Sequence, residues 1–143
     1  MSTDPSALAV VQEVFRCFAG HDVPGLMAVL DEEIEWHEPD VDVPWRGVHR
    51  GHDGFVSWLH IIGRELADLV VQPHEFIATD DTVVVLGHES ACVTATGRTY
   101  HSDFTFVFRV RNGKLTAFRA YHDTDAMMRA TADRQRDTEQ TGE

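Results

Sequence analysis

The chain has few basic residues for its number of acidic ones. Lysine and arginine together number 12 against 24 aspartates and glutamates, which gives a formal net charge of -12. Such a charge repels the phosphate backbone of nucleic acids and anionic bilayers alike. We therefore expect neither a nucleic-acid partner nor a membrane partner.

Cysteine is also scarce, and long hydrophobic runs are absent. The two cysteines, Cys17 and Cys92, form no CxxC pair, so the sequence predicts neither a zinc knuckle nor a disulfide framework. No stretch reaches the roughly 18 apolar residues of a membrane span. The first residues, MSTDPSALAV, lack the charged and apolar regions of a secretory signal. These absences favour a reducing, cytoplasmic location.

Length and composition are those of one folded domain. The 143 residues are 43% hydrophobic and 25% charged, and a chain of this size buries roughly 70% of its unfolded surface around one core. We expect a single domain over residues 1–132. The last residues, 133–143, contain no large apolar side chain and are expected to form a polar, disordered tail.

The first half of the chain carries helical patterns. Asp4 and Pro5 suit a helix start, and apolar residues then recur at helical spacing until Gly20. A turn at 21–24 precedes a second, short helix that includes Leu26, Met27 and Leu30. A third helix is expected to follow Asp53 as its N-cap. Its apolar stripe consists of Phe55, Trp58, Leu59, Ile62, Leu66 and Leu69.

Strand patterns occupy the rest of the chain. Residues 33–38 alternate between two faces, and 39–52 read as an irregular loop. Four β-rich stretches separated by turn sequences then predict an antiparallel meander, in which the longest strands must bend or carry bulges. These stretches are 70–78, 82–95, 98–111 and 114–123. The order predicts an α+β fold, with helices closing a pocket against a curved, cone-shaped sheet.

Glu38 lies on the apolar face of the first strand. Because Ile34, Trp36 and Glu38 share that face, the alternation that buries the first two carries a carboxylate inward. A structural Glu38 would form a salt bridge or hydrogen bond, for instance to Arg46 or a histidine. A functional Glu38 would be a general base, since burial beside Trp36 raises its pKa. The sequence leaves both interpretations open.

His122 is the second candidate. Phe118, Ala120 and His122 alternate with more polar neighbours on the last strand, so His122 is expected to face inward. It is either a core histidine satisfied by one hydrogen bond or an acid/base partner of Glu38. Both interpretations stay open.

Other chemical motifs are missing. The nine histidines include no HxH or HExxH pattern, so no metal site is predicted. No GxSxG elbow, P-loop or GxGxxG motif occurs, which disfavours hydrolases of that type and nucleotide binding. His101 and Asp103 share one strand face, opposite to Phe104, Phe106 and Phe108, and a surface or dimer-contact role is expected for them.

Five stretches of the sequence form a family pattern. They are VVQ at 10–12, GHD at 20–22, EP at 38–39, WRGVHRG at 45–51 and VFRVRNGKL at 107–115. With them, residues 8–128 resemble the nuclear transport factor 2-like superfamily, in particular its SnoaL-like and ketosteroid-isomerase-like branch. The resemblance implies a cone-shaped, cystatin-like α+β barrel that dimerises through the outer sheet face and binds small hydrophobic molecules. It also implies a general base at Glu38, the acid that precedes the proline.

Two positions depart from the isomerase pattern. Where isomerases of this branch carry a tyrosine and an acid that stabilise an oxyanion, this chain has Val14 and Phe106. Steroid isomerisation through that donor pair is therefore not expected. His122 stands where isomerases carry an aromatic residue and could supply a different donor.

Two functions follow from these observations. The first is a dimeric, cofactor-free enzyme that isomerises or cyclises a hydrophobic, polyketide- or steroid-like carbonyl compound. Glu38 would move the proton, and His122 would be a donor or second acid/base group. The residues expected to enclose the substrate are Trp36, Trp58, Leu59, Phe106 and Phe118. The alternative is a non-catalytic ligand-binding or protein-docking module of the same fold.

Overall fold

The computed structural model describes residues 4–132, and the expected tail at 133–143 lies outside them. The helices are α1 (Ala7–Ala19), α2 (Val23–Val29), α3 (Gly51–Glu65) and α4 (Thr124–Thr131). The strands are β1 (Leu30–Glu38), β2 (Gly47–Arg50), β3 (Leu66–Ala78), β4 (Thr82–Val93), β5 (Thr99–Arg111) and β6 (Lys114–His122). Within this part of the chain no helix is long and apolar enough to cross a membrane.

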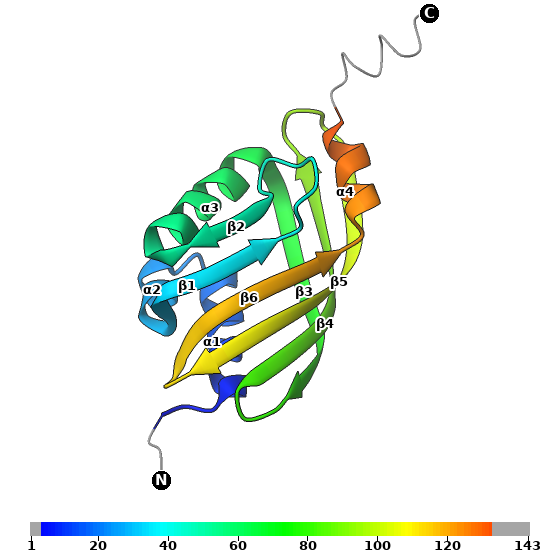
Figure 1. Cartoon of the computed structure of the whole chain (residues 1–143). Coiled ribbons are helices and arrows are strands. Elements are labelled where there is room, and N and C mark those ends of the chain that lie inside the picture. Colours follow the sequence, from blue (N-terminus) through cyan, green and yellow to red (C-terminus); the bar gives the residue numbers. More distant parts are fainter. Residues whose placement is uncertain (1–3, 133–143) are drawn as a thin grey trace, which may run out of the picture.

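The strands form one mixed sheet in the order β2-β1-β6-β5-β4-β3. Only β1 and β6 run parallel, and the other neighbours are antiparallel. The sheet curves around α1, which packs against β3 to β6, and α3 packs against β1 to β3 (Figure 1). The α+β fold is thus confirmed. In the described residues β2 and β3 remain open edges, so helices rather than further strands close the cone.

The long strands are irregular, as expected. The pairing of β3 with β4 shifts register between Ala67 and Val70 and again between Pro73 and Glu75. The pairing of β5 with β6 shifts after Arg109. Pro73 lies on an edge strand beside one of these register shifts, and both are places where a sheet tolerates proline. These bulges give the sheet the bend that encloses the core.

Several boundaries differ from the sequence prediction. Ser6, and not Asp4, caps α1, since its side chain accepts from the backbone N–H of Ala9. The third helix begins at Gly51, before Asp53, and no side chain caps it. It also ends earlier, because Leu66 is already extended. The last part of the apolar stripe, Leu66 and Leu69, therefore belongs to β3.

Two elements were not predicted. Residues 47–50, within the expected loop, form β2 and pair with the end of β1. Four residues are too few to show an alternating pattern. Beyond β6, Asp123 accepts from the N–H of Ala126 and caps α4, whose Met127 and Ala130 are buried. The first strand also starts earlier than expected, at Leu30, which pairs with Leu115 on β6.

Candidate active site

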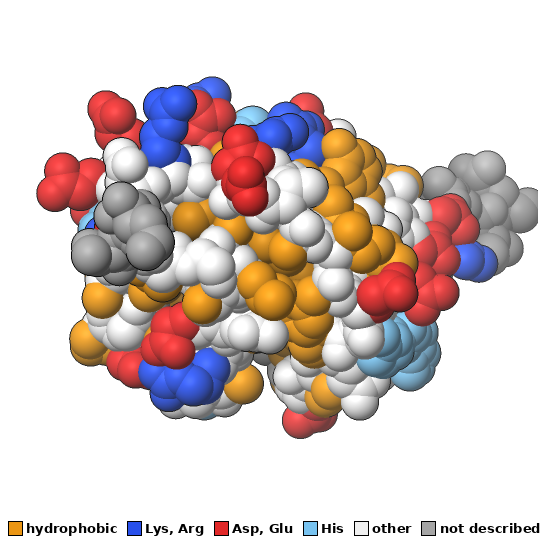
Figure 2. Space-filling view, turned by 90° about the horizontal axis from the view of Figure 1, so that it is seen from below, with side chains coloured by type: hydrophobic (Ala, Val, Ile, Leu, Met, Phe, Trp, Pro, Cys, Tyr) orange, Lys and Arg blue, Asp and Glu red, His pale blue; other side chains and the backbone are white. Residues whose placement is uncertain are grey.

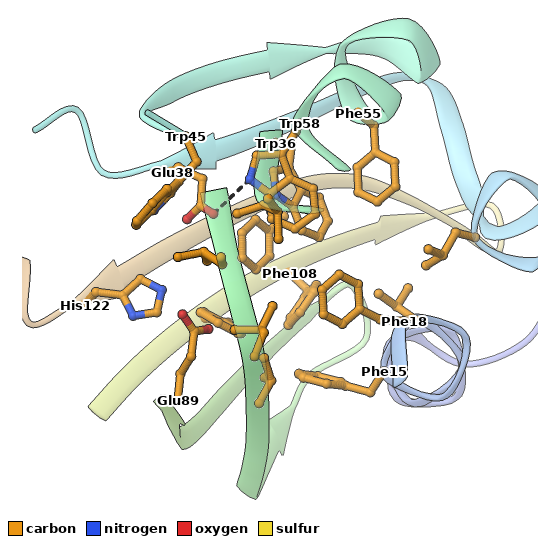
Figure 3. Close-up of a pocket in the computed structure, with 18 of the residues that line it drawn as sticks. Phe15, Phe18, Trp36, Glu38, Trp45, Phe55, Trp58, Glu89, Phe108 and His122 are labelled. Carbon is orange, nitrogen blue, oxygen red and sulfur yellow. Dashed lines mark hydrogen bonds between the residues drawn. The ribbon is translucent and has the colours of Figure 1, made fainter. Parts of the chain in front are cut away.

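A cavity of about 60 Å³ lies between the inner face of the sheet and the helices. Phenylalanine, tryptophan and aliphatic side chains make up most of its wall (Figure 3). Its titratable side chains are Glu38, Glu89, Tyr100 and His122. Since cavities of ligand-binding proteins usually measure about 300 to 1,000 Å³, this one accepts only a small molecule unless its wall moves.

Glu38 reaches the cavity from the last position of β1. Alternation along the strand buries Ile34 and Trp36 on the same side. The indole Nε1 of Trp58 on α3 donates to Glu38 Oε2 at 3.0 Å, as Figure 3 shows. The other oxygen, Oε1, is fully buried and has no hydrogen-bond partner among residues 4–132.

These surroundings change the acidity of Glu38. Burial, and next the nearby charge of Glu89, raise its pKa to about 8, while the hydrogen bond from Trp58 acts in the opposite direction. No ion pair with Glu38 occurs in the part of the chain that the structure describes. Arg46, one possible partner of a structural Glu38, has its Nε 4.0 Å from Asp40 Oδ1 instead. The environment of Glu38 therefore favours its neutral form at pH 7.

His122 faces the same cavity from β6. Its Nδ1 lies 3.1 Å from Ser102 Oγ, which also accepts from the Asp123 N–H and donates to the Asp103 carbonyl. All three contacts are satisfied when Nδ1 carries the proton, which leaves Nε2 as an acceptor. Burial lowers the pKa of His122 to about 4. Neutral His122 is thus an acceptor rather than an acid near pH 7.

Aromatic rings form the wall beside Glu38. Trp36 stacks on Phe118 with ring centroids 3.9 Å apart and also contacts Trp58 at 4.9 Å. Phe106 lies 4.9 Å from Phe118 and 5.5 Å from the His122 ring. The indole Nε1 of Trp36 is buried without a partner among the described residues.

The expected site residues are therefore brought together with one exception. Trp36, Glu38, Trp58, Phe106, Phe118 and His122 all line the cavity. Leu59 does not, because the inward face of α3 presents Phe55, Trp58 and Ile62, and Leu59 is only partly buried beside the core. Leu59 therefore packs beside the core and does not line the cavity, contrary to the prediction that it encloses the substrate.

A second buried carboxyl group, that of Glu89 on β4, was not predicted from the sequence. It exposes 8% of its surface and accepts a 2.6 Å hydrogen bond from the hydroxyl of buried Tyr100 on β5. Burial raises the pKa of Glu89 to about 7, against the effects of the Tyr100 hydrogen bond and the His88 charge. Burial also raises the pKa of Tyr100. The sequence did contain a sign that Glu89 faces inward, because it alternates along β4 in phase with the buried Val83 and Val85.

The expected pair His101 and Asp103 lies on the outer face of the sheet. Asp103 contacts His88 Nδ1 at 2.9 Å across the strands, and the His88 and His101 rings stack at 5.7 Å. In residues 4–132 no group of three or more histidine, cysteine or acidic side chains could hold a metal ion. This cluster is separate from the cavity.

Comparison with known proteins identifies the family. The model of the SnoaL-like domain matches residues 11–118. No protein of curated function matches the chain. Among solved structures, a nuclear transport factor 2-like protein from Burkholderia xenovorans LB400 is 35% identical, with a TM-score of 0.81, over 87% of this chain and 95% of that one.

Two further structures share the fold, one of a protein co-crystallised with a small molecule and one of a complex with a small molecule. TerC, co-crystallised with polyporic acid, is 25% identical, with a TM-score of 0.78, over 87% of this chain and 96% of its own. A protein with a ketosteroid isomerase-like fold from Catenulispora acidiphila, in complex with trimethylamine, is 11% identical, with a TM-score of 0.73, over 90% and 94%. The family match and the 35% identity to the Burkholderia xenovorans protein show that the chain belongs to the SnoaL-like family of the nuclear transport factor 2-like superfamily.

Proposed function

We propose that this SnoaL-like protein is an enzyme that isomerises or cyclises a small hydrophobic carbonyl compound by acid/base chemistry, without a cofactor, with Glu38 as the proton carrier. The observation that supports this most is the buried, unpartnered Oε1 of Glu38 in an otherwise apolar cavity. A buried polar atom without a partner is costly. A ligand that hydrogen-bonds to Oε1 would remove that cost. The same contact would place the ligand next to a group that can transfer a proton.

The acidity of Glu38 suits a carbonyl substrate. With a pKa of about 8, Glu38 holds its proton at pH 7 and donates it to a carbonyl oxygen. A carboxylate formed there in the course of the reaction is a stronger base than an exposed glutamate. Nε2 of His122 is available to accept a hydrogen bond from the substrate, and the rings of Trp36, Phe106 and Phe118 enclose the reacting atoms.

The test is exchange of a carbon-bound proton, which needs no knowledge of the natural product. The probe is 2-tetralone in deuterium oxide, and 1H NMR follows loss of the protons beside its carbonyl. Wild type should accelerate the exchange over buffer, and Glu38→Gln should lose that acceleration. Equal acceleration by both proteins would rule out Glu38 as the proton carrier.

Ligand binding is tested separately by tryptophan fluorescence, because Trp36 and Trp58 line the cavity. The small probe is 2-tetralone, and polyporic acid, with which TerC was co-crystallised, tests whether the cavity wall moves to admit a larger ligand. Saturable quenching without proton exchange on any ketone would favour the alternative, a ligand-holding module of the same fold. The small and mostly apolar cavity is the observation that keeps this alternative open.

The homodimer is proposed through the outer face of the sheet. There Ile77, Val84 and Val107 lie in one row across β3, β4 and β5, and Leu86 lies in the next, in line with Tyr121. Ile77 and Tyr121 are 51% and 54% exposed. Figure 2 shows hydrophobic side chains in a band across one face of the molecule, with histidines at one end. Sedimentation of a monomer at every concentration would contradict the dimer.

A further inference from the structure

Glu38 is not the only carboxyl group in the cavity. In β4 every second residue is buried, and this alternation turns Glu89 inward. Figure 3 shows the carboxyl groups of Glu38 and Glu89 directed toward each other from opposite walls, with His122 to one side. Two acids that share an apolar, enclosed space need an explanation, because burial of a charge without a cation is unfavourable.

We propose that Glu89 is a second proton carrier of this site, acting as the base opposite Glu38, with Tyr100 as the residue that stabilises its charge. This inference rests on the proposed function. It assigns a role to two residues that line the cavity and that neither the sequence nor the family pattern had singled out.

Hydrogen bonding separates the two acids. Glu89 Oε2 accepts from the Tyr100 hydroxyl at 2.6 Å, whereas Glu38 Oε2 accepts from an indole N–H at 3.0 Å. A short bond from a hydroxyl to a carboxylate stabilises the charged form more than a longer bond from a neutral N–H. Glu89 is therefore the first of the two to ionise.

The charge of Glu89 then acts on Glu38. The pKa of Glu38, about 8, includes a contribution from Glu89, while that of Glu89 is about 7. The other titratable groups around Glu89 are Tyr100, His122 and its strand neighbour His88. When the two acids together carry one negative charge, the Tyr100 hydrogen bond therefore favours that charge on Glu89 and leaves the proton on Glu38, an acid and a base on opposite walls.

This state can complete an isomerisation without an added reactant. Glu89 removes a proton from the carbon beside the carbonyl, and the C–H electron pair forms a C=C bond. The carbonyl π pair takes the Glu38 proton, which gives the enol and leaves Glu38 as carboxylate. When the substrate is a β,γ-unsaturated ketone, this enol is a conjugated dienol. Glu89 then returns its proton to the γ carbon, the C=C bond moves next to the carbonyl, and Glu38 regains the enol proton as the C=O bond re-forms. Both residues end as they began.

The first experiment is 13C NMR titration of protein labelled at the glutamate carboxyl carbons, with signals assigned by loss in Glu38→Gln and Glu89→Gln. Because Glu89 ionises first, Glu89→Gln should lower the midpoint of Glu38, whereas Glu38→Gln should leave the midpoint of Glu89 nearly unchanged. Tyr100→Phe should raise the midpoint of Glu89. A Glu89 signal that titrates near the ordinary value of about 4.3, or a Glu38 midpoint insensitive to Glu89→Gln, would overturn the proposal.

The second experiment is the pH profile of 2-tetralone exchange. Glu89→Gln should slow exchange at least about 10²-fold and remove the rise in rate near pH 7. Glu89→Asp keeps a carboxyl group, so it should restore part of the rate and part of the rise near pH 7. Exposed Glu75 on β3 supplies the control, Glu75→Gln, expected to behave as wild type. Loss of exchange in Glu38→Gln with an unchanged profile in Glu89→Gln would refute the role of Glu89 alone. Absence of exchange by wild type would refute the proposed function and this inference with it.

Discussion

Glu35 and Glu38 lie three residues apart on β1 but on opposite faces of the sheet. Glu35 faces outward, 3.0 Å from His37 Nε2 and 2.9 Å from Arg50 Nη1. The His37 hydrogen bond and then the Arg50 charge lower its pKa. Glu38 faces inward, where burial and the charge of Glu89 raise its pKa. The same side chain on one strand is thus an ordinary surface acid or a candidate catalytic acid, depending only on which face it occupies.

The largest expected difference between the two faces is in catalysis. Glu38→Gln should reduce the rate of 2-tetralone exchange by about 10² to 10⁴-fold, since it removes the proton carrier. Glu35→Gln, the matched change on the outer face, should leave the rate within about twofold of wild type. Both rates are measured by NMR under identical conditions. An equal loss of exchange rate in the two variants would mean that the sheet face does not determine whether a glutamate is catalytic.

The pH dependence of stability should differ next. The pKa of Glu38 is raised from 4.5 to about 8 in the folded state, so its contribution to stability is fully present below pH 4.5 and is lost as the pH rises toward 8. The loss is on the order of 3–5 kcal/mol. Glu38→Gln should therefore reduce the fall in the free energy of unfolding between pH 5 and pH 8, measured in urea.

The contribution of Glu35 to stability changes with pH in the opposite direction. Its folded-state pKa is lowered, so its contribution appears above the unfolded pKa and is lost on acidification. Glu35→Gln should keep the full loss of stability toward pH 8. If both variants showed the wild-type dependence, the buried environment assigned to Glu38 would be wrong.

A smaller effect is expected from the indole groups beside Glu38. Trp58→Phe removes the donor to Oε2, which should cost about 1–3 kcal/mol and raise the Glu38 pKa further. Trp36→Phe is the matched control, because the Trp36 Nε1 has no partner in the described residues. Urea unfolding measures the cost in free energy for Trp58→Phe. Carboxyl 13C titration should show a raised Glu38 pKa in Trp58→Phe and no change of that pKa in Trp36→Phe.

The smallest effect should come from the outer ion pair. Asp103 is 94% exposed and His88 is 32% exposed, so solvent screens their interaction. Asp103→Asn should change the free energy of unfolding by less than about 1 kcal/mol. A larger loss in urea would show that this outer pair contributes as a buried one does, and would weaken the distinction between the faces.

Alternation in the sequence was enough to predict the inward face of β1. It placed Trp36 and Glu38 together, and the helix pattern placed Trp58 on the covering helix. The fold class followed from the order of the elements and is confirmed by the six-stranded sheet and the family match.

What the sequence could not provide is the pairing across strands. Glu89 stood on an inward face like Glu38, but its partner Tyr100 is set by the register of β4 and β5. The same holds for Ser102, which fixes the His122 ring across β5 and β6. The sequence also could not show that Leu59 lies outside the cavity, because the apolar stripe of a helix is wider than the part of it that reaches a small cavity.

The central claim is that the inner face keeps Glu38 protonated at neutral pH. The most direct test is the carboxyl 13C titration of Glu38, with its signal identified by its disappearance in Glu38→Gln. A midpoint near 8 is expected. A midpoint near 4.3, the value of a glutamate in water, would contradict the account.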